Sequence, residues 1–119
     1  MSEKSSETHR TALSALAEPN RLRIVELLRN GPLTVGEIAD RVGLRQPQTS
    51  KHLKVLSDQG IVNVEVAANR RIYRLRPEPF RALDAWLHSF ERIMRERFDN
   101  LDDYLRELQS QNDKQDQSD

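Results

Sequence analysis

The sequence predicts a mainly α-helical fold with one small β-hairpin: four helices come first, then the hairpin, then a long fifth helix. Three observations favour this fold. Apolar residues recur at intervals of three and four along most of the chain, which is the period of a helix with one buried face. Between residues 61 and 75 the pattern changes to β-branched residues typical of strands. From residue 79 the helical spacing returns and continues to about residue 109.

Composition narrows the class of protein. The chain has 119 residues, of which 36% are hydrophobic and 32% charged, and this indicates one well-solvated domain. The absence of cysteine excludes disulfides, thiolate metal sites and cysteine nucleophiles. No apolar run is long enough for a membrane span, and the first ten residues lack a secretory signal, so we expect a cytoplasmic protein. We predict a flexible N-terminus (1–6), one domain (7–109) and a disordered polar tail (110–119).

The first two helices are predicted over residues 7–17 and 20–30. Pro19 separates them because it disfavours helix in the residue before it. Asn20, a residue type favoured at N-caps, is predicted to begin the second helix.

The third and fourth helices have clear boundary signals. Thr34 and Glu37 have the spacing of a capping box, and Gly43 stands where a left-handed residue ends a helix. Pro47 fits the first turn of the next helix, which runs to Gln59.

The hairpin and the last helix complete the order of elements. Strands are predicted over residues 61–66 and 71–75, joined by a four-residue connection, "AANR" (67–70). The fifth helix carries an apolar heptad seam that only Arg97 interrupts, and a seam of this length needs a partner helix.

Charge is distributed unevenly although the formal net charge is zero. Residues 45–76 contain seven basic and two acidic residues, whereas residues 77–119 contain six basic and eleven acidic residues. A basic middle segment indicates a polyanion partner, although an ordinary solvated surface explains the same count.

Two short helices joined by "GLR" and followed by a hairpin form the pattern of a winged helix-turn-helix. In this motif the start of the second helix enters the DNA major groove. The stretch "QPQTSKHLKVL" (46–56) has polar and basic side chains and no acid, which suits a groove lined by phosphates. Gln48 and Thr49 are suited to base edges and Lys51 to guanine or phosphate. His52 has the alternative of a hydrogen bond inside the domain.

Three segments, "ALAEPNRLRIVELL" (15–28), "LTVGEIADRVGLRQPQTSKHLKVLSDQGIV" (33–62) and "RRIYRL" (70–75), resemble the ArsR/SmtB-type bacterial transcriptional repressors. The resemblance covers about residues 11 to 105. It implies a homodimer built on the first and fifth helices that binds imperfect palindromes in double-stranded DNA and represses its own or a neighbouring operon. The predicted DNA-binding residues are Arg45, Gln46, Gln48, Thr49, Lys51, His52, Lys54, Asn69, Arg70 and Arg71. The predicted dimer contacts are Leu13, Leu16, Phe80, Leu83, Leu87, Phe90, Met94 and Leu101.

The chain departs from that family at two places. Arg45 stands where a serine usually begins the fourth helix, so Gln46 is expected as a weak cap and Arg45 as a phosphate contact. The metal-responsive members carry cysteine ligands where this chain reads "TVG" (34–36), and the fifth helix offers only Asp84, His88 and Glu91 on one face. We therefore expect the branch without metal, with no cofactor and an unknown inducer.

Two alternatives to a DNA-binding repressor without metal remain. One is a metal-sensing repressor of the same family. The other is a winged-helix module for protein–protein contact, which the basic segment and the acid-free helix disfavour. No nucleophile–base pair or glycine-rich phosphate loop stands out, so we do not expect an enzyme.

Overall fold

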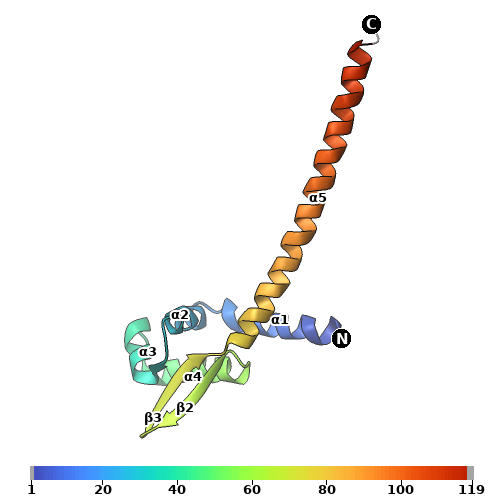
Figure 1. Cartoon of the computed structure of the whole chain (residues 1–119). Helices are drawn as coiled ribbons and strands as arrows, with labels where there is room; N and C mark the ends of the chain where they lie inside the picture. Colours follow the sequence, from blue (N-terminus) through green and yellow to red (C-terminus); the bar gives the residue numbers. More distant parts are fainter. Residues whose placement is uncertain (1, 118–119) are drawn as a thin grey trace. The chain divides into compact units, whose positions relative to one another are not determined.

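The computed structural model describes residues 2–117, and side chains within residues 7–113. Helices and the two hairpin strands follow the predicted order (Figure 1). One additional short strand precedes the third helix. The elements are α1 (Ser2–Ala17), α2 (Pro19–Leu28), β1 (Leu33–Thr34), α3 (Val35–Val42), α4 (Gln46–Asp58), β2 (Val62–Ala67), β3 (Arg70–Leu75) and α5 (Pro77–Gln117). By its internal contacts the chain divides into two units, Met1–Leu83 and Asp84–Asp119, and each is described by itself.

Local hydrogen bonds explain where the first unit's helices begin and end. The capping box of α3 is confirmed: the Thr34 hydroxyl accepts from the Glu37 N–H (3.2 Å), and the Glu37 carboxylate accepts from the Thr34 N–H (3.1 Å). Gly43 ends α3 in the left-handed region (φ 72°), which a residue without a Cβ adopts at little cost. The prediction of an Asn20 cap is wrong. Glu18 caps α2, because Pro19 takes the first helical position, where its missing N–H is no loss.

The sheet has three antiparallel strands in the order β1-β3-β2. In the hairpin Val62 pairs with Leu75 and Ala67 with Arg70, so the turn is only Ala68 and Asn69, not the predicted four residues. Both turn residues have positive φ (49° and 70°), as in the two-residue turns that match the twist of a hairpin. The sequence did not predict β1, whose two residues pair with β3 and are too few to show a strand period.

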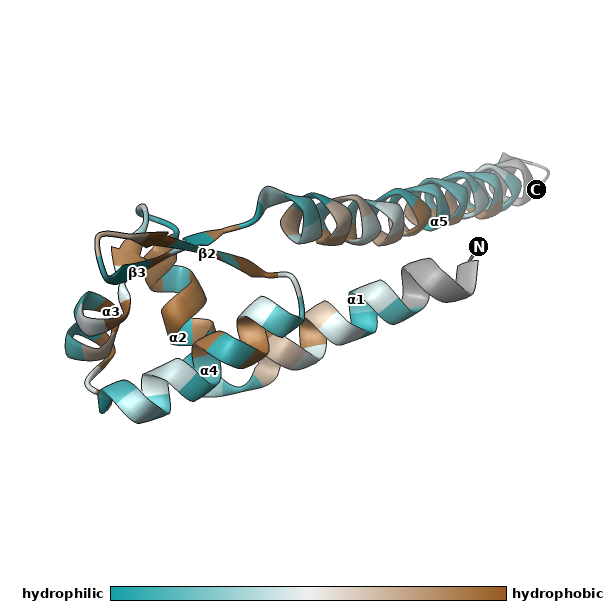
Figure 2. Ribbon diagram, turned by 90° about the horizontal axis from the view of Figure 1, so that it is seen from below, coloured by the Kyte–Doolittle hydropathy of each residue, from teal (hydrophilic) through white to brown (hydrophobic). Residues whose placement is uncertain are grey.

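The core of the first unit lies between the helices and the sheet. The apolar segments of α2 and of the strands are coloured brown in Figure 2. Burying each large aliphatic side chain stabilises the fold by about 1.5–3 kcal/mol relative to leaving it exposed. The largest apolar side chains with no appreciable exposure are Ile24, Ile38, Leu53, Leu56, Ile61 and Val62.

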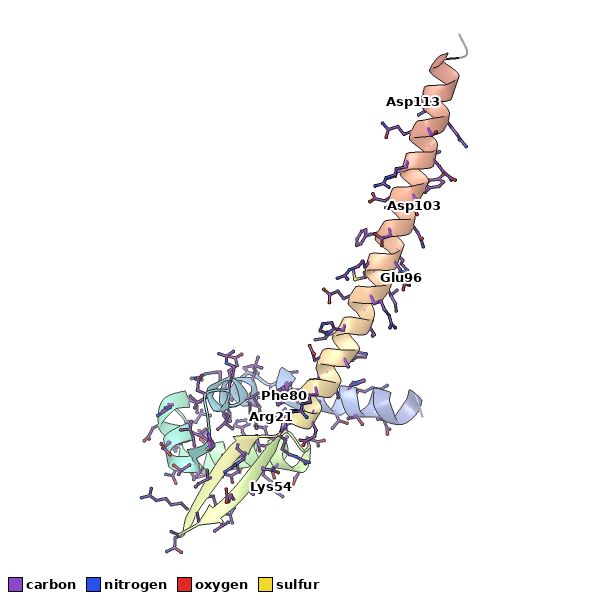
Figure 3. All side chains as sticks on the ribbon, viewed as in Figure 1. Arg21, Lys54, Phe80, Glu96, Asp103 and Asp113 are labelled. Atoms are coloured by element: carbon purple, nitrogen blue, oxygen red, sulfur yellow. The ribbon has the colours of Figure 1, made fainter. Side chains whose placement is uncertain are left out.

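The long helix α5 begins against this core and then exposes its side chains. Leu83 is buried and Phe80 packs partly against the core, whereas Leu87, Phe90 and Met94 are exposed. Figure 3 shows side chains, Glu96 and Asp103 among them, projecting from the part of α5 that belongs to the second unit. No helix among the described residues is long and apolar enough to cross a membrane.

The outer ends of α1 and α5 differ from prediction. The first helix begins at Ser2 rather than Glu7, and α5 ends at Gln117 rather than about Gln109. The polar residues 110–117, predicted as part of a disordered tail, therefore continue the helix. Residues 1, 118 and 119 lie outside the described residues.

Candidate nucleic-acid interface

We call α4 the recognition helix. Its first turns present an exposed polar surface without a carboxylate. Leu53 and Leu56 are fully buried and fix the inner side of the helix to the core. The exposed side chains on the other side include Gln46, Gln48, Lys51 and Lys54, together with Arg45 directly before the helix. The partial positive charge at a helix N-terminus adds to the attraction of this surface for an anion.

Arg45 stands at the N-cap position, directly before the recognition helix, but its side chain does not cap the helix. A guanidinium has no acceptor, so it cannot receive an N–H of the first turn. The Arg45 N–H donates to Oε1 of Gln48 at 3.5 Å, a long contact. The prediction that Gln46 caps the helix is wrong, because Gln46 is its first helical residue. The Gln46 side chain reaches α3, where its Nε2 lies 3.3 Å from where a Cβ on Gly36 would be.

Thr49 does not lie on the outer face, contrary to prediction. Its side chain is fully buried, and its hydroxyl donates to the Arg45 carbonyl at 3.0 Å. Because the hydroxyl is both covered and bonded, Thr49 is removed from the set of candidate base contacts.

His52 is half-buried and has a charged neighbour within the domain. Its Nδ1 lies 3.6 Å from Oε2 of Glu18, and the two side chains are 22% and 30% exposed. The Arg21 N–H, which donates to the same oxygen at 2.8 Å, is the main cause that lowers the pKa of Glu18. The alternative that His52 interacts within the domain therefore has structural support.

A groove separates the recognition helix from the hairpin. It has a volume of about 410 Å³ and combines basic and apolar side chains. Nζ of Lys54, a residue labelled in Figure 3, lies 3.5 Å from Oδ2 of Asp58, and this carboxylate balances part of the lysine charge. The lining residues are Ser50, Lys51, Leu53, Lys54, Ser57, Asp58, Val64, Arg71 and Tyr73.

The hairpin tip carries the predicted wing residues. Asn69, Arg70 and Arg71 are all exposed. Neighbouring residues of a strand point to opposite faces, so Arg71 shares the groove with Tyr73, whereas Arg70 faces the other way. There its positive charge adds to the lowering of the pKa of Glu37 in α3, for which the hydrogen bonds with Thr34 are the main cause.

The predicted dimer residues fall into two groups. Leu83 is buried in its own chain and Leu16 and Phe80 pack partly against the core, so the expectation that the whole set faces a partner is wrong for Leu83. The remaining residues are 42–58% exposed: Leu13, Leu87, Phe90, Met94 and Leu101.

The candidate metal residues of α5 form an ordinary surface cluster. His88 Nδ1 lies 2.8 Å from the Asp84 carbonyl oxygen and 3.3 Å from its carboxylate, and Nε2 lies 4.0 Å from Glu91. The contact with the Asp84 carbonyl is the main cause that raises the pKa of His88, and the two carboxylates add to it. No group of three metal-binding side chains with suitable geometry occurs within the described part of the chain.

Comparison with known proteins identifies the fold and the family. Residues 18–64 match the family model described as bacterial regulatory protein, arsR family. The HTH-type transcriptional regulator Rv2034 of Mycobacterium tuberculosis is 43% identical over 79 residues, which are 66% of this chain and 74% of that protein. The chain belongs to the ArsR family of bacterial regulatory proteins.

Other relatives and solved structures agree with this assignment. NmtR of M. tuberculosis is 42% identical over 65 residues, but these span only 54% of its length. The crystal structure of an ArsR family transcriptional regulator superposes with a TM-score of 0.68 at 30% identity, covering 76% of this chain and 93% of that one. The chain is thus a winged helix-turn-helix transcriptional regulator, and its family is one of regulators, not enzymes.

Sequence reasoning missed Glu18. Part of the signal was present, because a proline at the first helical position places the residue before it at the N-cap, although glutamate is not among the residue types preferred there. The contact between Glu18 and His52 had no local signal, since Glu18 precedes α2 and His52 lies far along the chain in α4.

Proposed function

We propose that this ArsR family member is a cytoplasmic homodimeric repressor that binds an imperfect palindrome in its own or a neighbouring operon. The observation that carries the proposal is the exposed, acid-free surface at the start of the recognition helix, beside a basic hairpin. Any carboxylate there would approach the phosphates that line the major groove, whereas amides and amines are the groups that read base edges.

Each exposed side chain has a distinct part in this proposal. Gln48 is placed to pair with adenine and Lys51 with guanine or a phosphate. Gln46, which packs toward α3, and Arg45 position the helix on the sugar–phosphate backbone. Arg71, Lys51 and Lys54 surround the groove, which we assign to a phosphate strand between the recognition helix and the wing. Asn69 and Arg70 extend the wing contacts.

A second copy of the chain supplies the other half of the DNA site. The exposed apolar residues of α1 and α5 need a partner surface, and a palindrome needs two recognition helices about 34–36 Å apart. A domain from Mycobacterium bovis with 26% identity and a TM-score of 0.60 is described as a homodimeric winged helix-turn-helix DNA-binding domain. That description supports a homodimer, and the exposed apolar residues of α1 and α5 are the surface that we assign to it.

Repression rather than activation is the proposed outcome of binding. One relative, from Staphylococcus xylosus, is an arsenical resistance operon repressor with 34% identity over 68 residues, which are 57% of this chain and 65% of that protein. Another relative, HlyU of Vibrio cholerae, is a transcriptional activator with 35% identity over 86 residues, which are 72% of this chain and 80% of that protein. A repressor needs only to occupy its site, and no surface for recruiting polymerase is required.

Selection from a pool of random duplexes tests the proposal. The wild-type chain should enrich an imperfect inverted repeat with half-sites about 10–10.5 base pairs apart, centre to centre. Lys51→Ala should weaken binding to the enriched duplex, whereas Arg106→Ala, which removes an equal charge from α5, should not. Absence of any enriched sequence would refute DNA reading. A reporter driven from the upstream region of the gene should be silenced by the protein, and stimulation of the reporter would refute repression.

A further inference from the structure

The corner between α1 and α2 contains a set of polar contacts that DNA reading does not use directly. Arg21 Nε donates to the Ala15 carbonyl at 2.7 Å, and Nη2 donates to the Ser14 carbonyl at 3.4 Å. These bonds satisfy acceptors at the end of α1, where carbonyls have no partner within the helix. The Arg21 N–H donates to Glu18 at 2.8 Å and thereby starts α2. The hydrogen bonds of Arg21 thus connect the end of α1 to the start of α2.

The same Glu18 carboxylate also approaches the recognition helix. Its Oε2 lies 3.6 Å from Nδ1 of His52. This separation is too long for a hydrogen bond but lies within the range of an ion pair, which forms when the ring carries a proton. Both side chains are more than two-thirds covered, so solvent screens their attraction less than it screens a fully exposed pair.

The position of His52 makes this contact relevant to DNA reading. His52 directly follows Lys51 and lies four residues after Gln48, so holding its side chain restrains the part of the recognition helix that carries both of these side chains. The beginning of the recognition helix has no side-chain cap, since Arg45 provides none and the Gln48 contact is long. Its local anchor is Thr49, whose N–H and hydroxyl both donate to the Arg45 carbonyl. A binding site needs its side chains held to within about 0.5 Å. The contact between Glu18 and His52 adds a link from outside the helix to this local anchor.

We infer that Glu18 is a positioning residue for the recognition helix: by holding His52 it sets the pose of Gln48 and Lys51, and it contributes to sequence discrimination without touching DNA. This inference rests on the proposed function, because it assumes that the recognition helix reads bases. Glu18 has a simpler structural role as the cap of α2, and the experiment has to separate that role from positioning.

Glu18→Asp separates the two roles. Aspartate is among the best N-caps, so α2 keeps its first turn, but its carboxylate is one methylene shorter and does not reach His52. The ratio of affinities for the selected duplex and for an unrelated duplex should fall about three- to tenfold, in the lower part of the range for losing one contact in a coupled network. Glu26→Asp makes the same chemical change on the exposed side of α2 and should leave the ratio unchanged.

A double-variant cycle with His52→Leu, which has no donor for a carboxylate, tests whether Glu18 acts through His52. Once the ring is gone, shortening Glu18 has nothing further to remove, so the double variant should discriminate as well as His52→Leu alone. Additive losses, or full discrimination by Glu18→Asp, would overturn the inference while the wild-type protein still selects its sequence. Failure of the wild-type protein to select any sequence would overturn the proposed function and, with it, this inference.

Discussion

At the scale of single residues, Thr49 shares a helical stripe with Leu53 and Leu56, four and seven positions further on. This spacing places it on the buried side of the recognition helix. Its polar atom suggested a DNA contact, but the hydroxyl is bonded to the Arg45 carbonyl at 3.0 Å. That carbonyl also accepts the Thr49 N–H at 2.9 Å, so it keeps a partner if the hydroxyl is removed.

Thr49→Val should therefore lower stability without changing base preference. The variant loses one intramolecular hydrogen bond and keeps nearly the same volume, so the free energy of unfolding should fall by about 1 kcal/mol. Gln48→Ala should behave in the opposite way, with little loss of stability and relaxed discrimination at one base pair, at a cost of about 1–3 kcal/mol in binding. Urea unfolding and binding to single-base variants of the operator measure the two effects. Altered base preference in Thr49→Val at unchanged stability would contradict this assignment.

Ala68 is a residue-scale feature that the sequence did not reveal. It adopts φ 49° at the hairpin tip, where a Cβ is strained and glycine is not. The sequence lacked the Asn-Gly or Asp-Gly pair that usually marks such a turn, so its length could not be predicted. Ala68→Gly should raise the free energy of unfolding by about 0.5–1 kcal/mol. The midpoint of urea unfolding measures this change, and an unchanged or lower midpoint would show that the turn is not strained.

At the scale of elements, the sequence was most informative where a side chain caps its own helix. The start and end of α3 were predicted because Thr34, Glu37 and Gly43 act through local geometry. The start of α2 was misplaced because two residues, Glu18 and Asn20, have capping chemistry and only Glu18 fits a proline at the first helical position. The strand β1 was missed because its pairing with β3 is entirely non-local.

The two capping glutamates predict how stability depends on pH. The Thr34 N–H and hydroxyl hold the pKa of Glu37 below its ordinary value of 4.5, and the Arg21 N–H does the same for Glu18. A lowered pKa in the folded state means that the unfolded chain binds more protons in this range. The stabilisation is therefore complete above about pH 4.5 and is lost as pH falls through the lowered folded pKa.

Glu37→Gln should make the acid limb of the stability profile shallower. The amide can still accept the Thr34 N–H but does not titrate, so one source of proton uptake on unfolding disappears. Thr34→Ala should also make it shallower, and it should cost about 1 kcal/mol at neutral pH through the lost cap. Urea unfolding midpoints between pH 3 and pH 7 provide the profile. An acid limb as steep as that of the wild type in both variants would show that the capping box does not contribute to acid sensitivity.

The wing can be tested through the salt dependence of binding. Each phosphate neutralised by a cation contributes about 0.9 to the slope of log affinity against log salt concentration. Arg70→Ala combined with Arg71→Ala should therefore weaken binding to all duplexes and make the slope shallower by roughly 2. Arg74→Ala is the matched control, because its guanidinium is already paired with Glu65 at 2.7 Å. A slope equal to that of the wild type would remove the wing from the contact set.

At the scale of the whole molecule, α5 carries more apolar surface than its own chain covers. Phe80, Leu83 and Leu87 belong to the same heptad seam, at steps of three and four residues, yet the first is partly covered, the second is buried and the third is 58% exposed. Spacing alone identifies an apolar face but not which neighbour covers it, because that depends on where the chain leaves the core. The same limit explains why all eight dimer residues were predicted together.

Leu87 is the most exposed of the predicted dimer residues and is therefore well suited to a test of the proposed homodimer. Leu87→Asp should leave the monomer folded, since little of the side chain is buried in its own chain. In a dimer the same change places a carboxylate in an apolar interface, and an unpaired buried charge is strongly destabilising. Sedimentation should therefore show monomers, and affinity for the complete palindrome should fall toward that for a single half-site.

The control for this prediction lies on the same helix. Ala85→Asp introduces the same charge at an exposed position that is turned well away from the Leu87 face at 3.6 residues per turn, and it should remain dimeric. Leu83→Asp is unsuitable, because Leu83 is buried in its own domain and its loss would unfold the monomer. Dimers of Leu87→Asp at the concentrations used for DNA binding would refute the α5 interface. Monomers that still bind the palindrome as tightly as the wild type would instead show that dimerisation does not underlie operator binding.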